Sequence, residues 1–546
     1  MKNKWVFVAA AAAALVLTAP ARAQQEHTHA HGEADKLGTV DFKTSCRPEV
    51  AAAFTRATAL LHSFGYEEAR KGFEDVAGRD PQCGIAYWGI AMTYYHPIWA
   101  SPNAAELAAG RAAAEKAALV GAKTDRERAY IAATSAFYRE ADPRARAQAF
   151  RQAMQDVERR FPADDEAAIF HALTLLATAP PSDATFANQK QAALVLNRLL
   201  PRYPDHPGIA HYVIHSFDYP ALANDALPAA RAYAKIAPAS PHALHMPSHI
   251  FTRLGLWPES IASNLDSAAA GRSLVAKTHP GATAFDTLHA LDYLEYAYLQ
   301  MDDRGRARAI LEEAAGTKTF DEPNFAAAYA LAAIPARWAL ERRDWKAAAA
   351  LELPTLELPW AQYPYIPAIT YFSRAIGAAK SGQPERAQEA LGTLREVQVG
   401  LAQSPPPGPY DWAGQVEAMR LTAAGIVARS LGRDDEALRL LRSGAELDEK
   451  TGKHPVTPGA VLPPRELLAD VLLETGRAAE ALAEYEAALR NAPNRFNSLA
   501  GAGRAAGRAG KPERAVELYG RLIEMTVKGA KRPELTEARR VVAARR

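Results

Sequence analysis

The stretch GRAAEALAEYEAALRNAP, residues 476–493, decides the fold of this chain. It starts at Gly476, places Ala481 and Ala488 on either side of Tyr485, and ends at Pro493. Glycine allows the positive φ of a tight turn between helices, and proline cannot continue a helix. Alanine lets two helices approach closely, while the aromatic ring fills the space between neighbouring units. The stretch therefore predicts a turn followed by a helix that packs closely against others.

The same pattern returns one period later. Gly510, Ala515 and Tyr519 repeat the turn, small and aromatic positions after 34 residues (510 − 476 = 34). These residues at this period resemble the tetratricopeptide repeat (TPR) family, in which each unit is a helical hairpin and the units stack into a solenoid. The resemblance covers most of residues 47–530. It implies an all-α fold, an α-α superhelix with a concave groove.

Prolines and glycines suggest how the chain is divided. Residues 46–401 are predicted to form a TPR-like superhelix with a His-rich groove. Residues 402–411 contain a run of prolines and are predicted to be a stiff linker. Residues 412–546 are predicted to be C-terminal TPR repeats. The loop that contains His454 is expected to be a rigid connector, with a lid over the groove as the alternative.

The N-terminus has the features of a secretory signal peptide over residues 1–23. Lys2 and Lys4 precede an apolar run that is too short to span a bilayer, and Ala21-Arg22-Ala23 fits a cleavage site. The mature protein is therefore expected to be periplasmic or secreted, without a transmembrane anchor, as an exported bacterial TPR-repeat protein. Residues 24–45 are polar and contain three alternating histidines, so a disordered leader is expected there.

The two cysteines and the charge balance narrow the possibilities further. Cys46 and Cys83 are an even pair in an oxidising compartment, and a disulfide between them is expected. Lysine and arginine number 64 against 62 aspartates and glutamates, so nucleic acid is not expected as the main partner. There is no phosphate-binding glycine loop, no HExxH motif and no GxSxG elbow in the sequence.

Two histidine pairs are the strongest pointer to function. His211 and His215 are four residues apart, and so are His245 and His249. The second pair follows the first by one repeat, since 245 − 211 = 34 and 249 − 215 = 34. Residues at i and i+4 share a helix face. The two pairs are therefore expected to stack on equivalent helices and to point the same way.

The TPR resemblance assigns a register to these residues. With Pro204 and Pro238 as closing prolines, both pairs fall at positions 5 and 9 of first helices, which line the concave groove in the family. On the same register, further groove residues are His242 and His289 at position 2, Asp292 at position 5 and Asp218 at position 12.

Histidine nitrogens from neighbouring helices can meet at one transition-metal ion, either Zn²⁺ or Cu. The predicted metal ligands are His211, His215, His242, His245, His249 and His289, with Asp218 or Asp292 as a carboxylate ligand. A catalytic ion would keep one coordination position open for water.

Two other interpretations remain open. The histidines can instead bind an acidic or aromatic ligand, as TPR grooves bind peptides, or they can be packing residues satisfied by backbone and water. Candidate ligand-binding residues are His62, His96, Arg253, Tyr212 and Tyr219. We therefore expect an exported scaffold that binds a peptide, a protein or a small ligand in its groove and carries a metal site. The alternatives are a metal-dependent enzyme and a structural platform without metal.

Overall fold

The computed structural model describes residues 35–98, 101–180, 183–406, 408 and 410–544. Over these residues the chain is a succession of α-helices with no β-strand, and the one isolated bridge joins Thr283 to Phe320. The all-α prediction is therefore confirmed. The predicted signal peptide and the leader histidines at 27, 29 and 31 lie outside the described residues.

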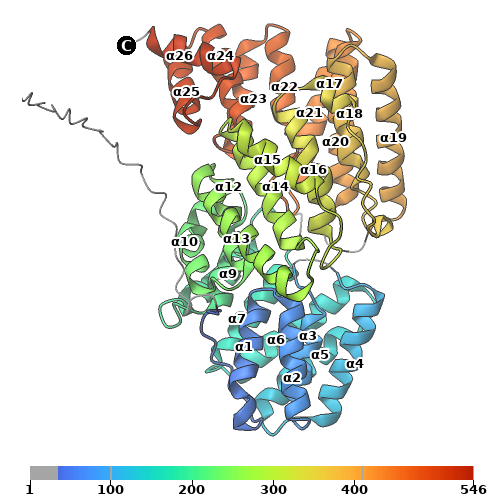
Figure 1. Cartoon of the computed structure of the whole chain (residues 1–546), viewed down its shortest axis with the longest axis vertical. Coiled ribbons are helices and arrows are strands. Elements are labelled where there is room, and N and C mark those ends of the chain that lie inside the picture. Colours follow the sequence, from blue (N-terminus) through green and yellow to red (C-terminus); the bar gives the residue numbers. More distant parts are fainter. Residues whose placement is uncertain (1–34, 99–100, 181–182, 407, 409, 545–546) are drawn as a thin grey trace, which may run out of the picture.

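The first third of the chain forms helical hairpins at one end of the molecule, drawn in blue and cyan in Figure 1. Its helices are α1 (Ala51–His62), α2 (Tyr66–Arg79), α3 (Gly84–Thr93), α4 (Ala104–Val120), α5 (Asp125–Arg139), α6 (Pro143–Arg160), α7 (Asp165–Ala177) and α8 (Ala187–Leu199).

The middle of the chain supplies the histidine-rich helices and the layer above them (Figure 1). It contains α9 (Pro207–Phe217), α10 (Leu227–Ile236), α11 (Pro241–His245), α12 (Pro247–Arg253), α13 (Trp257–Thr278), α14 (Phe285–Gln300), α15 (Arg304–Ala315), α16 (Phe325–Glu341) and α17 (Trp345–Ala349). Only Met246 separates α11 from α12, because Pro247 has no N–H to continue the helical hydrogen bonds.

The last third forms the opposite end of the molecule. Its helices are α18 (Pro367–Lys380), α19 (Pro384–Gln403), α20 (Trp412–Ser430), α21 (Asp434–Thr451), α22 (Pro464–Glu474), α23 (Ala478–Asn491), α24 (Phe496–Arg508), α25 (Pro512–Met525) and α26 (Pro533–Ala543). Three short 3₁₀ helices are Pro48–Val50, Ala223–Ala226 and Trp360–Gln362.

The C-terminal hairpins have glycine in their turns and tyrosine between their units, as their sequence predicts. Gly476 has φ 82° and Gly510 has φ 72°, the left-handed conformation that glycine tolerates best. Tyr485 and Tyr519 are buried between units. A Cβ on Gly501 would lie only 2.2 Å from the Tyr485 ring, so that helix needs glycine at the point of contact.

The segment before the first helix is packed rather than disordered from residue 37 onward. Leu37, Val40 and Phe42 are buried in the N-terminal core. The ring of Phe42 stacks on Trp88 with centroids 5.2 Å apart. These three apolar side chains cover the helices of the N-terminal core, although most of residues 24–45 are polar.

The Pro-rich segment does not separate two cores. One apolar core runs from Phe325 of α16 through α18, α20 and α22 to Ala538 of α26. The helices on both sides of residues 404–410 contribute to it, since Leu401 and Val416 are both members. The segment is therefore a connection inside one packed unit and not the boundary between a superhelix and a separate array.

The C-terminal part also contacts the middle of the chain. Trp257 Nε1 donates to the Asn494 carbonyl oxygen at 2.9 Å, and Arg495 donates to the Tyr296 hydroxyl at 2.8 Å. The buried Arg495 is paired with Glu341 at 2.8 Å and with Glu466 at 3.1 Å. These contacts fix the loop between α23 and α24 against α13, α14 and α16 in the middle of the chain.

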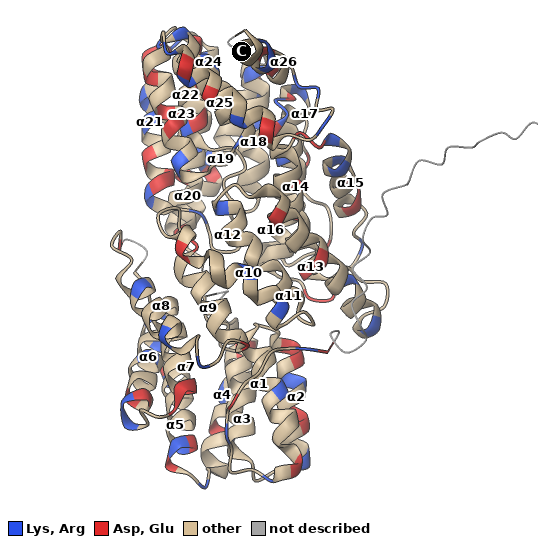
Figure 2. Cartoon of the chain, turned by 90° about the vertical axis from the view of Figure 1, so that its left-hand side faces the viewer, with Lys and Arg blue, Asp and Glu red and all other residues tan. Residues whose placement is uncertain are grey.

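The disulfide and the surface agree with the sequence analysis. Cys46 and Cys83 are bonded, with their Cα atoms 5.0 Å apart. Basic and acidic residues are interspersed along the helices in Figure 2. Among the described helices none is long and apolar enough to span a membrane.

Candidate metal centre

Three imidazoles from α9 and α11 form a first histidine triad, which consists of His211, His215 and His242. The Nε2 atom of His211 lies 3.1 Å from His215 Nε2 and 3.1 Å from His242 Nε2. His211 and His215 are one turn apart on α9, so their rings stack along one helix face. His242 reaches the same point from the start of α11.

A second histidine triad follows one repeat later and consists of His245, His249 and His289. His245 Nε2 and His249 Nε2 are 2.9 Å apart. The ring of His289, from α14, lies against His245 with centroids 4.1 Å apart. In each triad the three potential ligand atoms all lie within 4.8 Å of one another.

Hydrogen bonds on the far side of three rings decide which nitrogens carry protons. His211 Nδ1 lies 2.7 Å from the His62 carbonyl oxygen, and His249 Nδ1 lies 3.1 Å from Asp218 Oδ2. His245 Nδ1 lies 2.7 Å from Asn264 Oδ1. These oxygens only accept, so each Nδ1 carries the proton and each Nε2 keeps its lone pair. The lone pairs therefore point at the other imidazoles of the triad.

This arrangement suits an ion better than it suits hydrogen bonds. The single lone pair of His211 Nε2 faces two imidazole nitrogens at equal distance and can accept well from only one. Two nitrogens bound to one tetrahedral Zn²⁺ at the usual bond length are about 3.3–3.4 Å apart. The distances of 2.9 and 3.1 Å within the triads are close to this value.

The triads repeat the same construction and lie side by side. Each triad consists of the histidines at positions 5 and 9 of one repeat's first helix and the histidine at position 2 of the following repeat's first helix. Across the boundary, the ring centroids of His215 and His249 are 6.4 Å apart, and those of His242 and His245 are also 6.4 Å apart. The sequence analysis expected the two pairs to share one ion. The geometry instead divides the six histidines into two sites, because the next helix supplies a third imidazole to each pair.

The two predicted carboxylate ligands have different surroundings. Asp218 accepts from His249 Nδ1 and from Arg253 Nε at 2.8 Å, so it holds the ring of a candidate ligand in place. Such outer carboxylates fix the tautomer and ring orientation of metal-binding histidines. Asp292 accepts a hydrogen bond from Arg337 Nε at 2.9 Å. It was predicted as a metal ligand, but the structure places it in this buried ion pair with α16 and not in either triad.

Burial keeps the six imidazoles neutral. It lowers the pKa of His211 to about 3, and lowers the pKa of His249 from its ordinary value. The pKa values of His215, His242, His245 and His289 lie well below the ordinary value for the same reason, and neighbouring imidazoles lower them further. Metal binding needs the unprotonated ring. The site is therefore already in the protonation state that an ion requires near neutral pH.

The predicted ligand-binding residues are dispersed. Arg253 is held by Asp218, as described above. Tyr212 is buried, with its hydroxyl 3.0 Å from His62 Nδ1. The hydroxyl of Tyr219 accepts from Gln189. His96 lies against Tyr66, and its Nδ1 is 3.9 Å from Glu106. These side chains do not form a common ligand surface, because each is held by packing or by a partner on another helix.

A third cluster lies beside the first triad and contains His62, Glu166 and His206. We call it the histidine–glutamate cluster. His62 Nε2 lies 3.0 Å from one Glu166 oxygen, and His206 Nε2 lies 3.0 Å from the other. His206 Nδ1 accepts from the backbone N–H of Ile209, so its Nε2–H donates to Glu166. Both of these imidazole nitrogens face a carboxylate oxygen, and hydrogen bonding explains the cluster.

The loop at residues 452–463 covers the second triad. Lys453 Nζ lies 2.8 Å from Asp218 Oδ2, and the Tyr293 hydroxyl donates to the Val456 carbonyl oxygen at 3.2 Å. Arg337 donates to the carbonyl oxygens of Gly459 and Ala460. The loop thus occupies the groove above the histidines, which is the lid alternative of the sequence analysis.

Three supporting residues were missed from the sequence. Asn264 fixes the His245 ring, and Lys453 adds a positive charge beside Asp218. Phe64 has φ 55° and lies against all three rings of the first triad, at centroid distances of 4.4, 5.7 and 5.6 Å. A non-glycine residue held at positive φ is uncommon, and such strain concentrates at functional sites. No local pattern marks any of the three.

The known structures that resemble this chain do so weakly. No family model and no curated protein matches the chain. Yeast Tom70 is similar in structure with 10% identity and a TM-score of 0.33, over 91% of this chain and 96% of Tom70. A tetratricopeptide repeat protein from Parabacteroides merdae has 12% identity and a TM-score of 0.29, over 56% of this chain and 97% of its own.

Human IFIT1, in a dimer with PPP-AAAA, has 12% identity and a TM-score of 0.38, over 86% of this chain and 89% of its own. All three TM-scores are below 0.5, so these likenesses carry no argument about this chain. With its stacked helical hairpins and its 34-residue spacing, the chain is a TPR-like helical-repeat protein.

Proposed function

We propose that this TPR-like chain is an exported protein whose central repeats bind two transition-metal ions side by side, one in each histidine triad. The observation that carries the proposal is the close approach of imidazole nitrogens within each triad, with the Nε2 lone pairs of His211, His245 and His249 fixed by acceptors on the opposite side of these three rings. Imidazole donors suit Zn²⁺ and Cu, and the site has no thiolate because both cysteines are in the disulfide.

A metal-dependent enzyme is the second candidate, and the number of donors favours it. Three histidines leave one position of a tetrahedral ion for water or a substrate, as in catalytic zinc sites. Two adjacent ions can also hold both reacting oxygens of a substrate. In this candidate the chain's own residues orient the imidazoles through Asn264 and Asp218, and the 452–463 loop excludes bulk water.

A protein or peptide partner, the usual occupant of TPR grooves, is proposed for other parts of the superhelix. The loop at residues 452–463 already contacts Asp218, Tyr293 and Arg337 across the histidine region. A peptide lying over the triads would have to displace it. Small molecules are therefore the better candidates for ligands of the metal centre itself.

Metal analysis of the purified mature protein tests the proposal. The protein is stripped with a chelator, reconstituted with Zn²⁺ or Cu²⁺, freed of excess ion by gel filtration and analysed by mass spectrometry of the elements. We expect about two ions per chain. Less than about a tenth of an ion would contradict metal binding, and about one ion would contradict the two-site arrangement. A variant with His27, His29 and His31 changed to alanine controls for binding by the N-terminal tract.

A further inference from the structure

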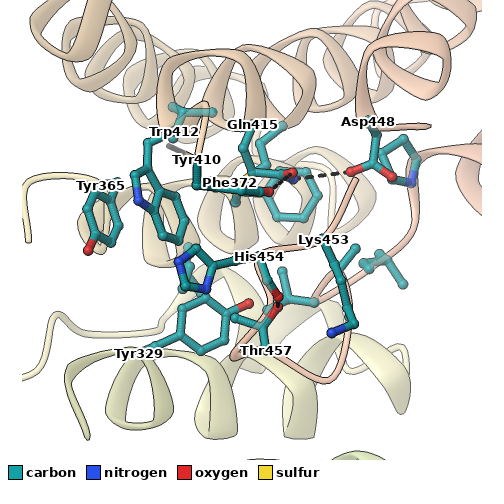
Figure 3. A pocket seen from close by; sticks show the side chains of 18 residues that line it. Tyr329, Tyr365, Phe372, Tyr410, Trp412, Gln415, Asp448, Lys453, His454 and Thr457 are labelled. Atoms are coloured by element: carbon teal, nitrogen blue, oxygen red, sulfur yellow. Dashed lines mark hydrogen bonds between the residues drawn. The ribbon is translucent and has the colours of Figure 1, made fainter. Parts of the chain in front are cut away.

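A pocket lined by aromatic side chains lies on the other side of the 452–463 loop. We call it the aromatic pocket. It encloses about 80 Å³ between α16, α18, α20 and the loop, and Figure 3 shows its walls. A single water needs about 10–15 Å³ of such space, so the pocket is large enough for a small organic ring. Its most prominent lining residues are Tyr329, Tyr365, Phe372, Tyr410, Trp412 and His454.

The walls of the pocket are flat. The rings of Tyr365 and Trp412 are parallel within 1°, with centroids 3.7 Å apart. His454 stacks against Trp412 at 5.1 Å and 20°, and Tyr410 meets Trp412 edge-on at 4.7 Å. Stacked and edge-to-face ring pairs are the arrangements that aromatic side chains prefer. A planar aromatic guest can extend this set of contacts, whereas a puckered ring of the same size cannot.

One end of the pocket carries a hydrogen-bond acceptor. Asp448 is held there by Gln415, whose Nε2 donates to Asp448 Oδ1 at 3.1 Å (Figure 3). Burial raises the pKa of Asp448 to about 6, so its carboxylate is less stable in the pocket than in water. A buried carboxylate gains from a further donor. A hydroxyl or amino group on the guest would supply one.

The pocket is connected to the second triad by a short series of contacts. Lys453 lines the pocket, and its ammonium group lies 2.8 Å from Asp218 Oδ2. Asp218 in turn contacts His249 Nδ1 at 3.1 Å. The loop therefore forms a wall of the pocket and the cover of the metal centre at once.

We infer that the aromatic pocket binds a small planar aromatic molecule that carries a hydrogen-bond donor, of the phenol class. Trp412 and its neighbours bind the ring, and Asp448 accepts from the hydroxyl group. The inference goes beyond the proposed metal centre and does not require it, since none of the six triad histidines lines the pocket.

Binding of phenol to the mature protein tests this inference, measured by saturation-transfer NMR as a function of phenol concentration. Cyclohexanol has the hydroxyl but no flat ring, and toluene has the ring but no donor. We expect phenol to bind more tightly than either. Trp412→Leu should weaken phenol binding about tenfold, since it removes the ring at the centre of the stack. Trp338→Leu, on the part of α16 that does not line the pocket, should leave it unchanged.

Asp448→Asn provides a second test if Trp412→Leu fails to fold. It should reduce the preference for phenol over toluene and leave toluene binding as it was. Phenol that binds no better than cyclohexanol, or equally well to wild type and Trp412→Leu, would overturn the inference. So would an Asp448→Asn variant with an unchanged preference.

Each titration is run on stripped and on reconstituted protein, with the metal content measured in parallel. If the reconstituted protein holds about two ions but does not bind phenol, only the inference about the aromatic pocket is contradicted. Phenol binding by protein that retains no metal after reconstitution contradicts the metal centre alone.

Discussion

The histidine triads and the histidine–glutamate cluster are neighbours in the structure, yet their imidazoles have different partners. In the cluster, His62 and His206 both place Nε2 at 3.0 Å from a Glu166 oxygen. In the triads, Nε2 atoms face other Nε2 atoms at 2.9–3.1 Å. All of these groups are almost completely buried except His215, so burial does not distinguish the two arrangements. The partner atom does: it separates a hydrogen-bonded network from the imidazole clusters that we propose bind a cation.

The free energy of the two arrangements differs accordingly. A buried polar group without a suitable partner is costly, while a carboxylate between two N–H donors is well satisfied. In the second triad the Nε2 lone pairs of His245 and His249 face each other at 2.9 Å, and in the first triad the one lone pair of His211 faces two imidazoles, so a bound cation would satisfy nitrogens that the protein alone does not. The triads should therefore gain stability from an ion, and the histidine–glutamate cluster should not.

The largest effect is expected from His245→Ala combined with His249→Ala. The double variant removes two of the three donors of the second triad and leaves the first triad intact. Bound metal should fall from about two ions to about one, with the helical circular dichroism unchanged. The matched control is His96→Ala, which removes a histidine outside the triads and should keep both ions. If the double variant still binds about two ions, the second triad is not a metal site and does not differ from the histidine–glutamate cluster in this respect.

Asn264→Ala should have the next largest effect, through the orientation of His245. Loss of an outer partner of this kind typically weakens metal binding about 10–100-fold. Competition with a chelator of known affinity measures the change. Ser267→Ala is the matched control, because Ser267 lies one turn away on α13 and donates to the Pro241 carbonyl oxygen instead. An equal loss in both variants would indicate a general disturbance of α13.

Glu166→Gln tests the histidine–glutamate cluster in place of the triads. It removes a carboxylate that two imidazoles contact, so the free energy of unfolding should fall by about 1–3 kcal/mol. The midpoint of urea unfolding of the stripped protein measures it. The metal content after reconstitution should stay the same. A loss of metal with this variant would mean that the cluster is part of the metal site.

The stability cost of Glu166→Gln should depend on pH. The pKa of Glu166 lies well below its ordinary value of 4.5, because the charges and hydrogen bonds of His206 and His62 outweigh its burial. A carboxyl with a lowered pKa in the folded state stabilises above its unfolded pKa and loses that contribution as the pH falls. The difference between wild type and variant should thus be full at neutral pH and narrow below about pH 4.5. A difference that widens there would contradict the assignment.

Part of this centre could be predicted from the sequence, for a clear reason. The 34-residue spacing located both i,i+4 pairs, and the TPR register added His242 and His289 at equivalent positions. The division into two triads was hidden, because His289 follows His242 by 47 residues (289 − 242 = 47) and not by one period. The extra length lies between the two helices, where α13 alone has 22 residues.

Contacts between distant segments could not be predicted from local patterns. Lys453 is 235 positions from Asp218, and Arg337 is 45 positions from Asp292. Periodicity describes the face on which a residue lies, but it does not say which side chain arrives there from another turn of the superhelix. For that reason the register placed Asp292 correctly on the helix and assigned it the wrong partner.

Anomalous diffraction from crystals of the reconstituted protein, collected at the absorption edge of the added metal, tests the central claim most directly. We predict two separate peaks, one within about 2.0–2.2 Å of the Nε2 atoms of His211, His215 and His242, and one equally close to those of His245, His249 and His289. A map without a peak at either triad, or with a peak at Glu166 instead, would contradict it.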